Sequence, residues 1–328
     1  MITNELHRRP QPPLLDIPDA NTGMHLAFER LQNGNYAGAF DVIDRLAQTF
    51  PGAQIEILAA AHDFYQMMQD RSRYHLYQSR HFDFPIHPGD KVLDIGSGHL
   101  PFPLATHLAD ITLTDHGYGR AGTPFKHVDG KPVYEVDVEN TGFADKEFDF
   151  VYCSHVLEHA RDPAAACREL IRIAKRGYIE TPRHGKDIFL NSGKASQHRW
   201  SVENVFGTLV FTEYTGEDLE GLGCGVLMDM HCAPETDREK AFSALIYLRA
   251  SQVNTMVMWS GDFPFEVRRV PAPAVIPAEP AAARIPPTPR PETRRLKFLQ
   301  VHTFYDVYLD WLYRQNPHLA QASYAEQN

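Results

Sequence analysis

The apolar positions between residues 24 and 68 recur at the spacing of an α-helix. They include Leu26, Leu31, Phe40, Ile43 and Leu46. The sequence Asn33-Gly34-Asn35 interrupts this pattern and Pro51-Gly52 ends it, so the pattern predicts a helical hairpin. A further helix is expected over residues 55–78. Residues 1–22 are polar and rich in proline, and they are predicted to form a flexible arm.

The helical segment, residues 23–80, loosely resembles a single tetratricopeptide unit. The matching positions are Gly34, Tyr36, Ala39, Leu46 and Pro51. One copy cannot bury the continuous core that about three stacked repeats provide. We therefore expect a helical cap packed against the main domain rather than a peptide-binding array.

From residue 91 onward, short apolar runs alternate with helical segments. The runs are VLDI (92–95), ITLTD (111–115), PVYEVDV (132–138), FDFVYCS (148–154) and GYIETP (177–182). This alternation predicts a mostly parallel sheet covered by helices, hence the α/β class. Two later runs, 243–250 and 254–260, predict a terminal antiparallel hairpin. The sheet would then have seven strands and occupy residues 81–263.

The C-terminal part has a different composition. Nine prolines occur from Pro264 to Pro291 inclusive, and proline disfavours both helices and central strands. Residues 264–295 are therefore predicted to be an extended tether. Within residues 296–328, the segment 296–315 is apolar on one helical face, which predicts a helix that docks on its own chain or forms a homodimer.

Charge and cysteine usage narrow the class of protein. The chain of 328 residues has a formal net charge of -10, which argues against a general nucleic-acid binder. Its four cysteines do not suggest a disulfide framework, and the N-terminus lacks the apolar core of a signal peptide. No apolar run approaches the roughly 20 residues that span a bilayer. We therefore expect a cytoplasmic protein without a membrane span.

A glycine loop follows the first predicted strand. Gly96 and Gly98 allow the backbone to approach a ligand closely. Asp115 lies 21 residues beyond Asp94, at the predicted end of the second strand, where a carboxylate can accept both hydroxyls of a ribose. Residues 99–103 replace the third glycine of a dinucleotide site. The first helix should then be short, about 104–108, which favours a nucleoside carrying an amino-acid group over a pyrophosphate.

With these features in order, residues 91–182 resemble a class I S-adenosylmethionine-dependent methyltransferase. The similarity is greatest to the bacterial group whose fourth strand reads like FDFVYCSHVLEH and whose fifth reads like RGYIETP. It covers about residues 75–260 and implies a Rossmann-like sheet with S-adenosylmethionine as the cofactor. The resemblance implies the following contacts: Asp94, Gly96 and Gly98 at the methionine end, Asp115 at the ribose, Asp137 and Val138 at the adenine, and Ser154 and His155 beneath the sulfur.

Residues 182–200 follow the fifth strand at the edge where open α/β sheets bind ligands. An acceptor hydroxyl needs a base, and histidine serves as one near neutral pH. The candidate bases are His155, His184 and His198, and the candidate acceptor contacts are Lys186, Arg199 and Trp200. The residues alone do not choose among the histidines. The alternative is a solvated polar loop that Trp200 anchors in the core.

Two other patterns could indicate a metal. The sequence HVLEH, residues 155–159, matches a zinc-peptidase pattern with Glu158 as acid/base. It directly follows a strand of an α/β pattern, however, so we interpret it as a strand-to-helix junction. Cys224, His231 and Cys232 include no C-x-x-C pair, which favours ordinary thiols. No metal is therefore expected.

These observations predict a methyltransferase that acts on a small polar acceptor. A carbohydrate, a glycan precursor or a secondary metabolite would fit, and O-methylation is favoured. Two alternatives stay open. One is a protein or nucleic-acid methyltransferase that uses the helical cap for docking, and the other is a cofactor-binding assembly protein without turnover.

Overall fold

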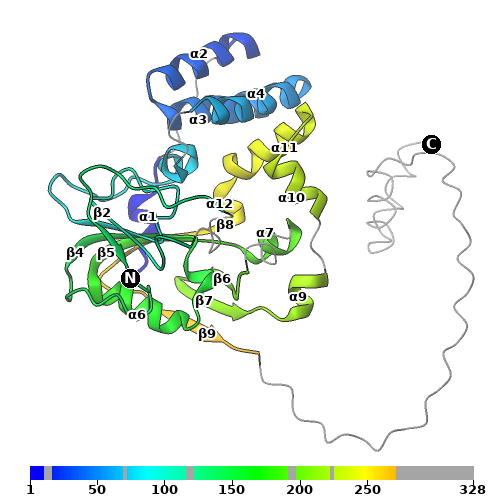
Figure 1. Cartoon of the computed structure of the whole chain (residues 1–328). Helices are drawn as coiled ribbons and strands as arrows, with labels where there is room; N and C mark the ends of the chain where they lie inside the picture. Colours follow the sequence, from blue (N-terminus) through cyan, green and yellow to red (C-terminus); the bar gives the residue numbers. More distant parts are fainter. Residues whose placement is uncertain (11–16, 69–71, 116–121, 191–196, 222–224, 271–328) are drawn as a thin grey trace, which may run out of the picture. The chain divides into compact units, whose positions relative to one another are not determined.

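The central sheet has six strands in the order β3-β2-β1-β4-β5-β8, in a computed structural model that describes residues 1–10, 17–68, 72–115, 122–190, 197–221 and 225–270 (Figure 1). The strands are β1 (Val92–Ile95), β2 (His107–Asp110), β3 (Val133–Glu135), β4 (Phe148–Ser154), β5 (Ala174–Pro182) and β8 (Asn254–Ser260). The first five are parallel, and β8 is antiparallel to β5. The mostly parallel α/β sheet is confirmed, with six strands instead of seven.

Alternate residues of the central strands enter two separate cores. Val92 and Tyr178 belong to the core shared with the helical cap. Their neighbours Leu93 and Ile179 belong to the core shared with helix α6 (Pro163–Ile173). Because both faces are covered, these strands are continuous apolar runs without alternation, and this explains why the sequence revealed β1 and β4 so clearly.

The helical cap consists of α2 (Ala20–Gln32), α3 (Tyr36–Thr49) and α4 (Gln54–Met67). Asn35 caps α3, and Gly34 has a φ of 73° in the preceding turn. These features agree with the predicted hairpin. A short π-helical turn (Tyr74–Gln78) and α5 (Ser79–His81) then lead to the sheet.

The prediction of a strand at residues 243–250 was wrong. These residues lie in α11 (Asp237–Leu248) and the start of α12 (Ala250–Val253), and α11 packs along α4. A capping box of Thr236 and Glu239 begins α11. The buried positions Ala241, Ala244 and Leu248 are spaced for a helix. The predicted terminal hairpin therefore does not form, and β8 pairs with β5 instead.

A second sheet has three strands in the order β6-β7-β9. They are β6 (Trp200–Val205), β7 (Thr208–Glu213) and β9 (Phe265–Arg268). The tether was predicted to begin at Pro264, but the proline-free residues after it form β9, which pairs in parallel with β7. The remainder of the predicted tether from residue 271, and the predicted docking helix, lie outside the described residues.

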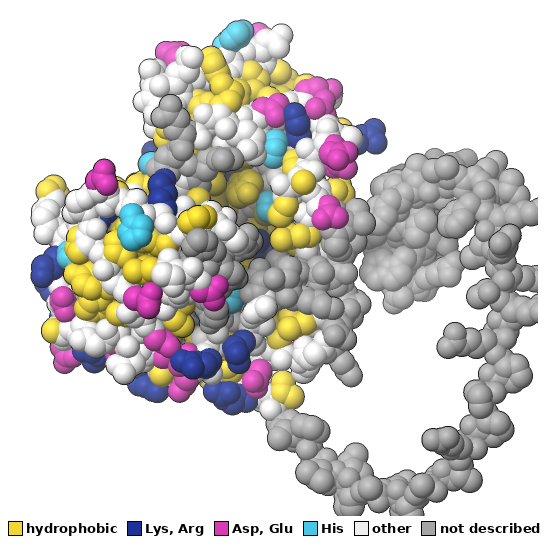
Figure 2. All heavy atoms as spheres, in the orientation of Figure 1, with side chains coloured by type: hydrophobic (Ala, Val, Ile, Leu, Met, Phe, Trp, Pro, Cys, Tyr) yellow, Lys and Arg dark blue, Asp and Glu magenta, His cyan; other side chains and the backbone are white. Residues whose placement is uncertain are grey.

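The N-terminal arm is structured where it is described. Helix α1 (Asn4–His7) lies beside β8, and the Asn4 side chain donates to the Met256 carbonyl and accepts from the Met258 amide. Further α-helices among the described residues are α7 (His184–Phe189), α9 (Gly216–Gly221) and α10 (Gly225–Cys232). Among the described residues, no helix is both long and apolar enough to cross a membrane. Acidic and basic side chains are interspersed on the face shown in Figure 2.

The segment between β1 and β2 departs most from the prediction. Residues 104–108 do not form a helix, and β2 covers residues 107–110 rather than 111–115. Phe102 is buried and stacks on Tyr152, with ring centroids 4.1 Å apart. Its amide donates to the Asp94 carboxylate at 2.7 Å. These contacts anchor a loop of successive turns, in which the Ala105 amide donates to the Phe102 carbonyl, and residue 107 pairs with Leu93 of β1.

Candidate active site

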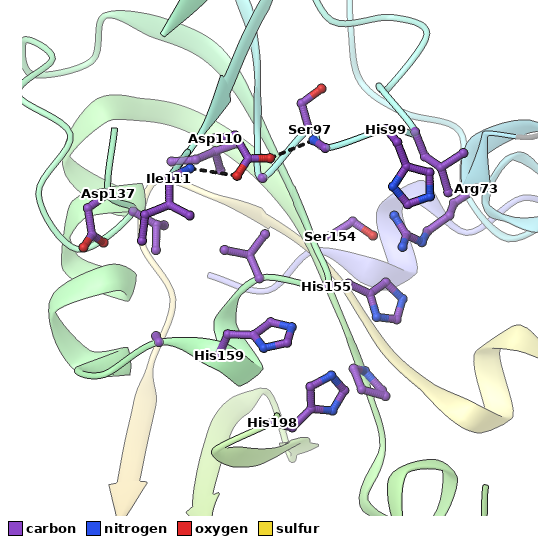
Figure 3. A pocket seen from close by; sticks show the side chains of 18 of the residues that line it. Arg73, Ser97, His99, Asp110, Ile111, Asp137, Ser154, His155, His159 and His198 are labelled. Carbon is purple, nitrogen blue, oxygen red and sulfur yellow. Dashed lines mark hydrogen bonds between the residues drawn. The ribbon is translucent and has the colours of Figure 1, made fainter. Parts of the chain in front are cut away.

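A cavity of about 320 Å³ opens at the carboxyl ends of the parallel strands (Figure 3). The ends of β1, β2 and β4 and the loop after β3 form one wall, and residues of α7 and α10 contribute to the other. The strand order reverses between β1 and β4. Open α/β sheets bind ligands at such a point because the loops on either side diverge.

Glycine is required in the loop after β1. Gly96 has a φ of +77°, and a Cβ added there would lie 2.1 Å from Cγ2 of Val156. Gly98 also has a positive φ, and its amide donates to Oδ2 of Asp110 at 2.9 Å. Gly96 and Gly98 both line the cavity. The loop therefore presents backbone to the cavity, as the sequence predicted.

Asp110 takes the place that the sequence assigned to Asp115. It ends β2, is 8% exposed and lines the cavity, while its Oδ1 accepts the Ile111 amide at 2.8 Å. Asp115 lies beyond the strand and is not among the described residues that line the cavity. The sequence HLAD, residues 107–110, could have indicated a strand that ends in Asp110. The more apolar run ITLTD directly after it was assigned as the strand instead.

Asp94 supports the loop from behind. It is 1% exposed, and it is not among the described cavity-lining residues. Burial raises the pKa of the Asp94 carboxyl to about 7, although the hydrogen bond from the Phe102 amide opposes this shift. Its described contact is thus with the loop backbone rather than with the cavity.

The loop after β3 brings Asp137 and Val138 to the cavity, as expected from the sequence. Oδ2 of Asp137 is 2.8 Å from Nη2 of Arg161, which is largely exposed. Val138 is 8% exposed. The two residues combine an acceptor with an apolar surface, the features that an adenine ring requires.

At the end of β4, Ser154 and His155 line the cavity. His155 has a φ of +59°, an uncommon conformation for a residue other than glycine. This conformation places its ring between two fully buried carboxylates. Nε2 lies 3.3 Å from Oε1 of Glu180, and Nδ1 lies 3.3 Å from Oε1 of Glu158.

Glu180 is held by several donors at the end of β5. Tyr77 donates to Oε1 at 2.6 Å, and Asn254 donates to the same oxygen at 2.8 Å. Burial disfavours the Glu180 anion, but the interaction with His155 and the tyrosine hydroxyls outweighs burial and lowers its pKa to about 2. An ionised Glu180 fixes the orientation of the His155 ring.

His198 lies across the cavity from the glycine loop and is 7% exposed. Its Nδ1 is 2.9 Å from Oδ2 of Asp187, which also accepts the Tyr214 hydroxyl at 3.0 Å. Burial would lower the pKa of His198, but Asp187 and Glu158 raise it overall. The His159 ring meets the His198 ring edge-on, with centroids 4.7 Å apart.

The structure separates the predicted acceptor residues into two groups. Lys186 lines the cavity, and its Nζ donates to Oδ1 of Asn254 at 2.9 Å. His184 and Arg199 are exposed and do not belong to the described lining. Trp200 is 1% exposed and donates to the Ala160 carbonyl at 2.6 Å. The alternative interpretation of Trp200, as an anchor in the core, is therefore the one that the structure supports.

Several lining residues were not predicted to form the site. They are Arg73, His99, His159, Met228, His231 and Cys232. Burial lowers the pKa of His231 to about 4. Cys224 lies outside the described residues. Periodicity could not reveal these positions because they come from turns and from a helix far along the chain.

Comparisons with known proteins agree with this geometry. A family described as a methyltransferase domain matches residues 93–179. On this match the chain is a methyltransferase enzyme, and S-adenosylmethionine is the cofactor that the match implies. No curated protein matches the chain.

Solved structures give more distant likenesses. A chain of the complex between a Haloferax volcanii methyltransferase activator and a methyltransferase is 15% identical, with 63% of this chain and 95% of that chain covered and a TM-score of 0.33. An S-adenosylmethionine-dependent methyltransferase from Mesorhizobium loti is 15% identical, with 53% and 92% covered and a TM-score of 0.29. One from Thermotoga maritima is 20% identical, with 43% and 61% covered and a TM-score of 0.27.

Proposed function

We propose that the enzyme transfers the methyl group of S-adenosylmethionine to a hydroxyl of a small polar acceptor, such as a carbohydrate, glycan precursor or secondary metabolite. The observation that carries this proposal is the position of His155. Its ring lies in the same cavity as the glycine loop and is held by Glu180 on one side. Methyl transfer is an in-line displacement that depends mainly on bringing donor and acceptor together.

The cofactor would occupy the wall formed by β1, β2 and β4. The Gly96–Gly98 backbone suits the methionine end, Asp137 and Val138 suit the adenine, and Ser154 lies where the sulfur would approach. We assign the ribose to Asp110 in place of Asp115. An ionised carboxylate offers about four acceptor sites, so Asp110 can bond a ribose while still accepting the Gly98 amide.

The acceptor would occupy the wall formed by α7 and α10. Lys186 provides a cationic donor there, and His231 provides an imidazole that burial keeps neutral, because its pKa is about 4. Arg73, which lies beside His99 in Figure 3, adds a second cation to the same cavity. Such a wall suits an acceptor rich in hydroxyls, with or without an anionic group. In this arrangement Nε2 of His155 would stay on Glu180. The acceptor hydroxyl would displace the 3.3 Å contact between Nδ1 and Glu158 and give its proton to Nδ1, and Glu180 would stabilise the imidazolium that forms.

The test is transfer of labelled methyl from S-adenosylmethionine into fractions of a cell extract. Label in small solutes or glycans supports the proposal. Label in protein or nucleic acid supports the docking alternative, and cofactor binding without any transfer supports the non-catalytic one. His155→Gln should abolish transfer while leaving cofactor affinity nearly unchanged, whereas His184→Gln, at an exposed position outside the described lining, should not affect either.

A further inference from the structure

The acceptor side of the cavity contains a buried cluster of three residues that can ligate a metal. They are Glu158, His159 and His198, and one potential ligand atom from each lies within 4.8 Å of the other two. Glu158 is 0% exposed. His159 and His198 line the cavity, and Figure 3 shows their rings turned toward one another. The cluster is therefore both enclosed and accessible from the cavity.

Glu158 is a buried carboxylate that faces histidine nitrogens without accepting a hydrogen bond from a described residue. Neither of its oxygens makes a well-aligned hydrogen bond with a described residue, although Nδ1 of His155 lies 3.3 Å from Oε1. A buried charge without partners is strongly unfavourable. Because the histidines and Glu158 converge on one point, a cation between them would satisfy this carboxylate.

The distances suit such a cation. Nε2 of His198 is 3.9 Å from Oε1 of Glu158, which is too long for a hydrogen bond. Two ligands bound at about 2.1 Å to a tetrahedral zinc ion lie roughly 3.4 Å apart. The pair would thus need to close by only about 0.5 Å to hold an ion with these bond lengths.

The orientation of His198 supports the same conclusion. Its Nδ1 is 2.9 Å from Oδ2 of Asp187, and Asp187 is itself 1% exposed. This contact leaves Nε2 directed toward Glu158. A carboxylate on the far nitrogen is the usual support of a metal-binding histidine, because it fixes the tautomer and the ring orientation.

We propose that Glu158, His159 and His198 bind a divalent transition metal of the zinc class, with an open position toward the cavity. Three nitrogen and oxygen ligands with a vacant position are the donor set of catalytic zinc sites. This proposal replaces the expectation of no metal. It also differs from the sequence pattern HVLEH, because His155 is not in the cluster, and His198, which is distant in the sequence, completes it.

Metal binding itself goes beyond methyl transfer, but a role for the metal rests on the proposed function. An acceptor oxygen at the open position would be oriented beside the methyl donor, and its hydroxyl would become more acidic. His155 would then remove a proton that is more easily lost.

The experiment is a titration of the chelator-treated full chain with zinc by calorimetry and with cobalt(II) by visible absorption. We expect one equivalent bound and intense cobalt bands of a four- or five-coordinate site. Asp187→Asn should weaken affinity by about 10- to 100-fold, and His198→Ala should abolish the bands. His184→Ala also removes one histidine of the 17 in the chain, at an exposed position, and is the matched control.

Misfolding of a variant would not decide the result, because the cobalt spectrum of the unmodified chain is an independent readout. Bound metal should also raise its melting temperature, since only the folded state holds the cluster together. Absence of the intense bands overturns the proposal. Equal loss of binding in His198→Ala and His184→Ala means an adventitious ion only and also overturns it. Cofactor affinity measured on the chelator-treated protein keeps the two proposals separate. Cofactor binding without metal binding overturns only the metal site. Metal binding without cofactor binding overturns only the proposed function.

Discussion

Replacing Gly96 by alanine should destabilise the enzyme more than the same change at a glycine that has a positive φ but open space around an added Cβ. The φ of +77° alone costs a residue with a Cβ about 1–2 kcal/mol. The added Cβ would also lie 2.1 Å from Cγ2 of Val156, and overpacking of this kind typically costs about 1–3 kcal/mol. Together the two effects predict a loss of roughly 2–5 kcal/mol in the free energy of unfolding.

Gly142→Ala separates the two contributions. Gly142 has a φ of +74°, but nothing lies within 4 Å of an added Cβ, so this variant should lose only about 1–2 kcal/mol. Val156→Ala removes the clashing atom. In the Gly96→Ala background it should therefore restore about 1–3 kcal/mol, which a double-mutant cycle isolates.

Denaturant unfolding of the four variants supplies these free energies, and calorimetry with S-adenosylmethionine shows whether the loop still binds. We expect Gly96→Ala to weaken cofactor binding, because Gly96 lines the cavity, while Gly142→Ala should leave it unchanged. Equal losses of stability in the two glycine variants, or no coupling between residues 96 and 156, would show that the Val156 contact does not explain the need for glycine.

Three further predictions follow from the site. Asp110→Ala should weaken cofactor binding by about 1.5–3 kcal/mol for each lost hydrogen bond to a charged acceptor, and Asp115→Ala should have no effect in the same calorimetric assay; the opposite ranking would contradict our placement of the ribose. The folded-state pKa of Asp94, about 7, exceeds its ordinary value of 3.8, so this group's contribution to stability is present at low pH and is lost as pH rises through that interval. Denaturation of Asp94→Asn at pH values of about 4 and 8 should therefore show a gain relative to the unmodified chain at the higher pH, and a constant difference would argue against a buried acid. Trp200→Ala should lose about 3–5 kcal/mol of stability, whereas Lys186→Met should chiefly raise the KM for the acceptor; a rise in KM with unchanged stability for Trp200→Ala would return this residue to the acceptor site.

The sequence alone determined the features that depend on local chemistry. Short apolar runs that alternate with helical segments favour central parallel strands, so β1 and β4 were predicted at the right positions, and Gly96 and Gly98 marked the loop after β1. The cap hairpin was similarly clear, because Asn33-Gly34-Asn35 favours a turn in any context. The order of these motifs also indicated the methyltransferase class before any contact was known.

The tertiary structure decided what depends on partners distant in the sequence. HLAD and ITLTD are both plausible strands, and only the register against β1, with Phe102 stacked on Tyr152, selects Asp110 over Asp115. The apolar residues of the run 243–250 are compatible with either a helix or a strand. The packing of this segment along α4 selects the helix.

The cluster of Glu158, His159 and His198 depends most on contacts between residues that are distant in the sequence. Glu158 and His198 are 40 residues apart in the sequence, and they meet because the Arg199 amide donates to the Glu158 carbonyl at 2.7 Å, just before β6 begins. No periodicity within either segment encodes that hydrogen bond, since it forms only when β6 packs beside the 3₁₀ turn Leu157–His159. The residues that can perform the chemistry are therefore visible in the sequence, but the set that acts together is chosen by the packing of the two sheets.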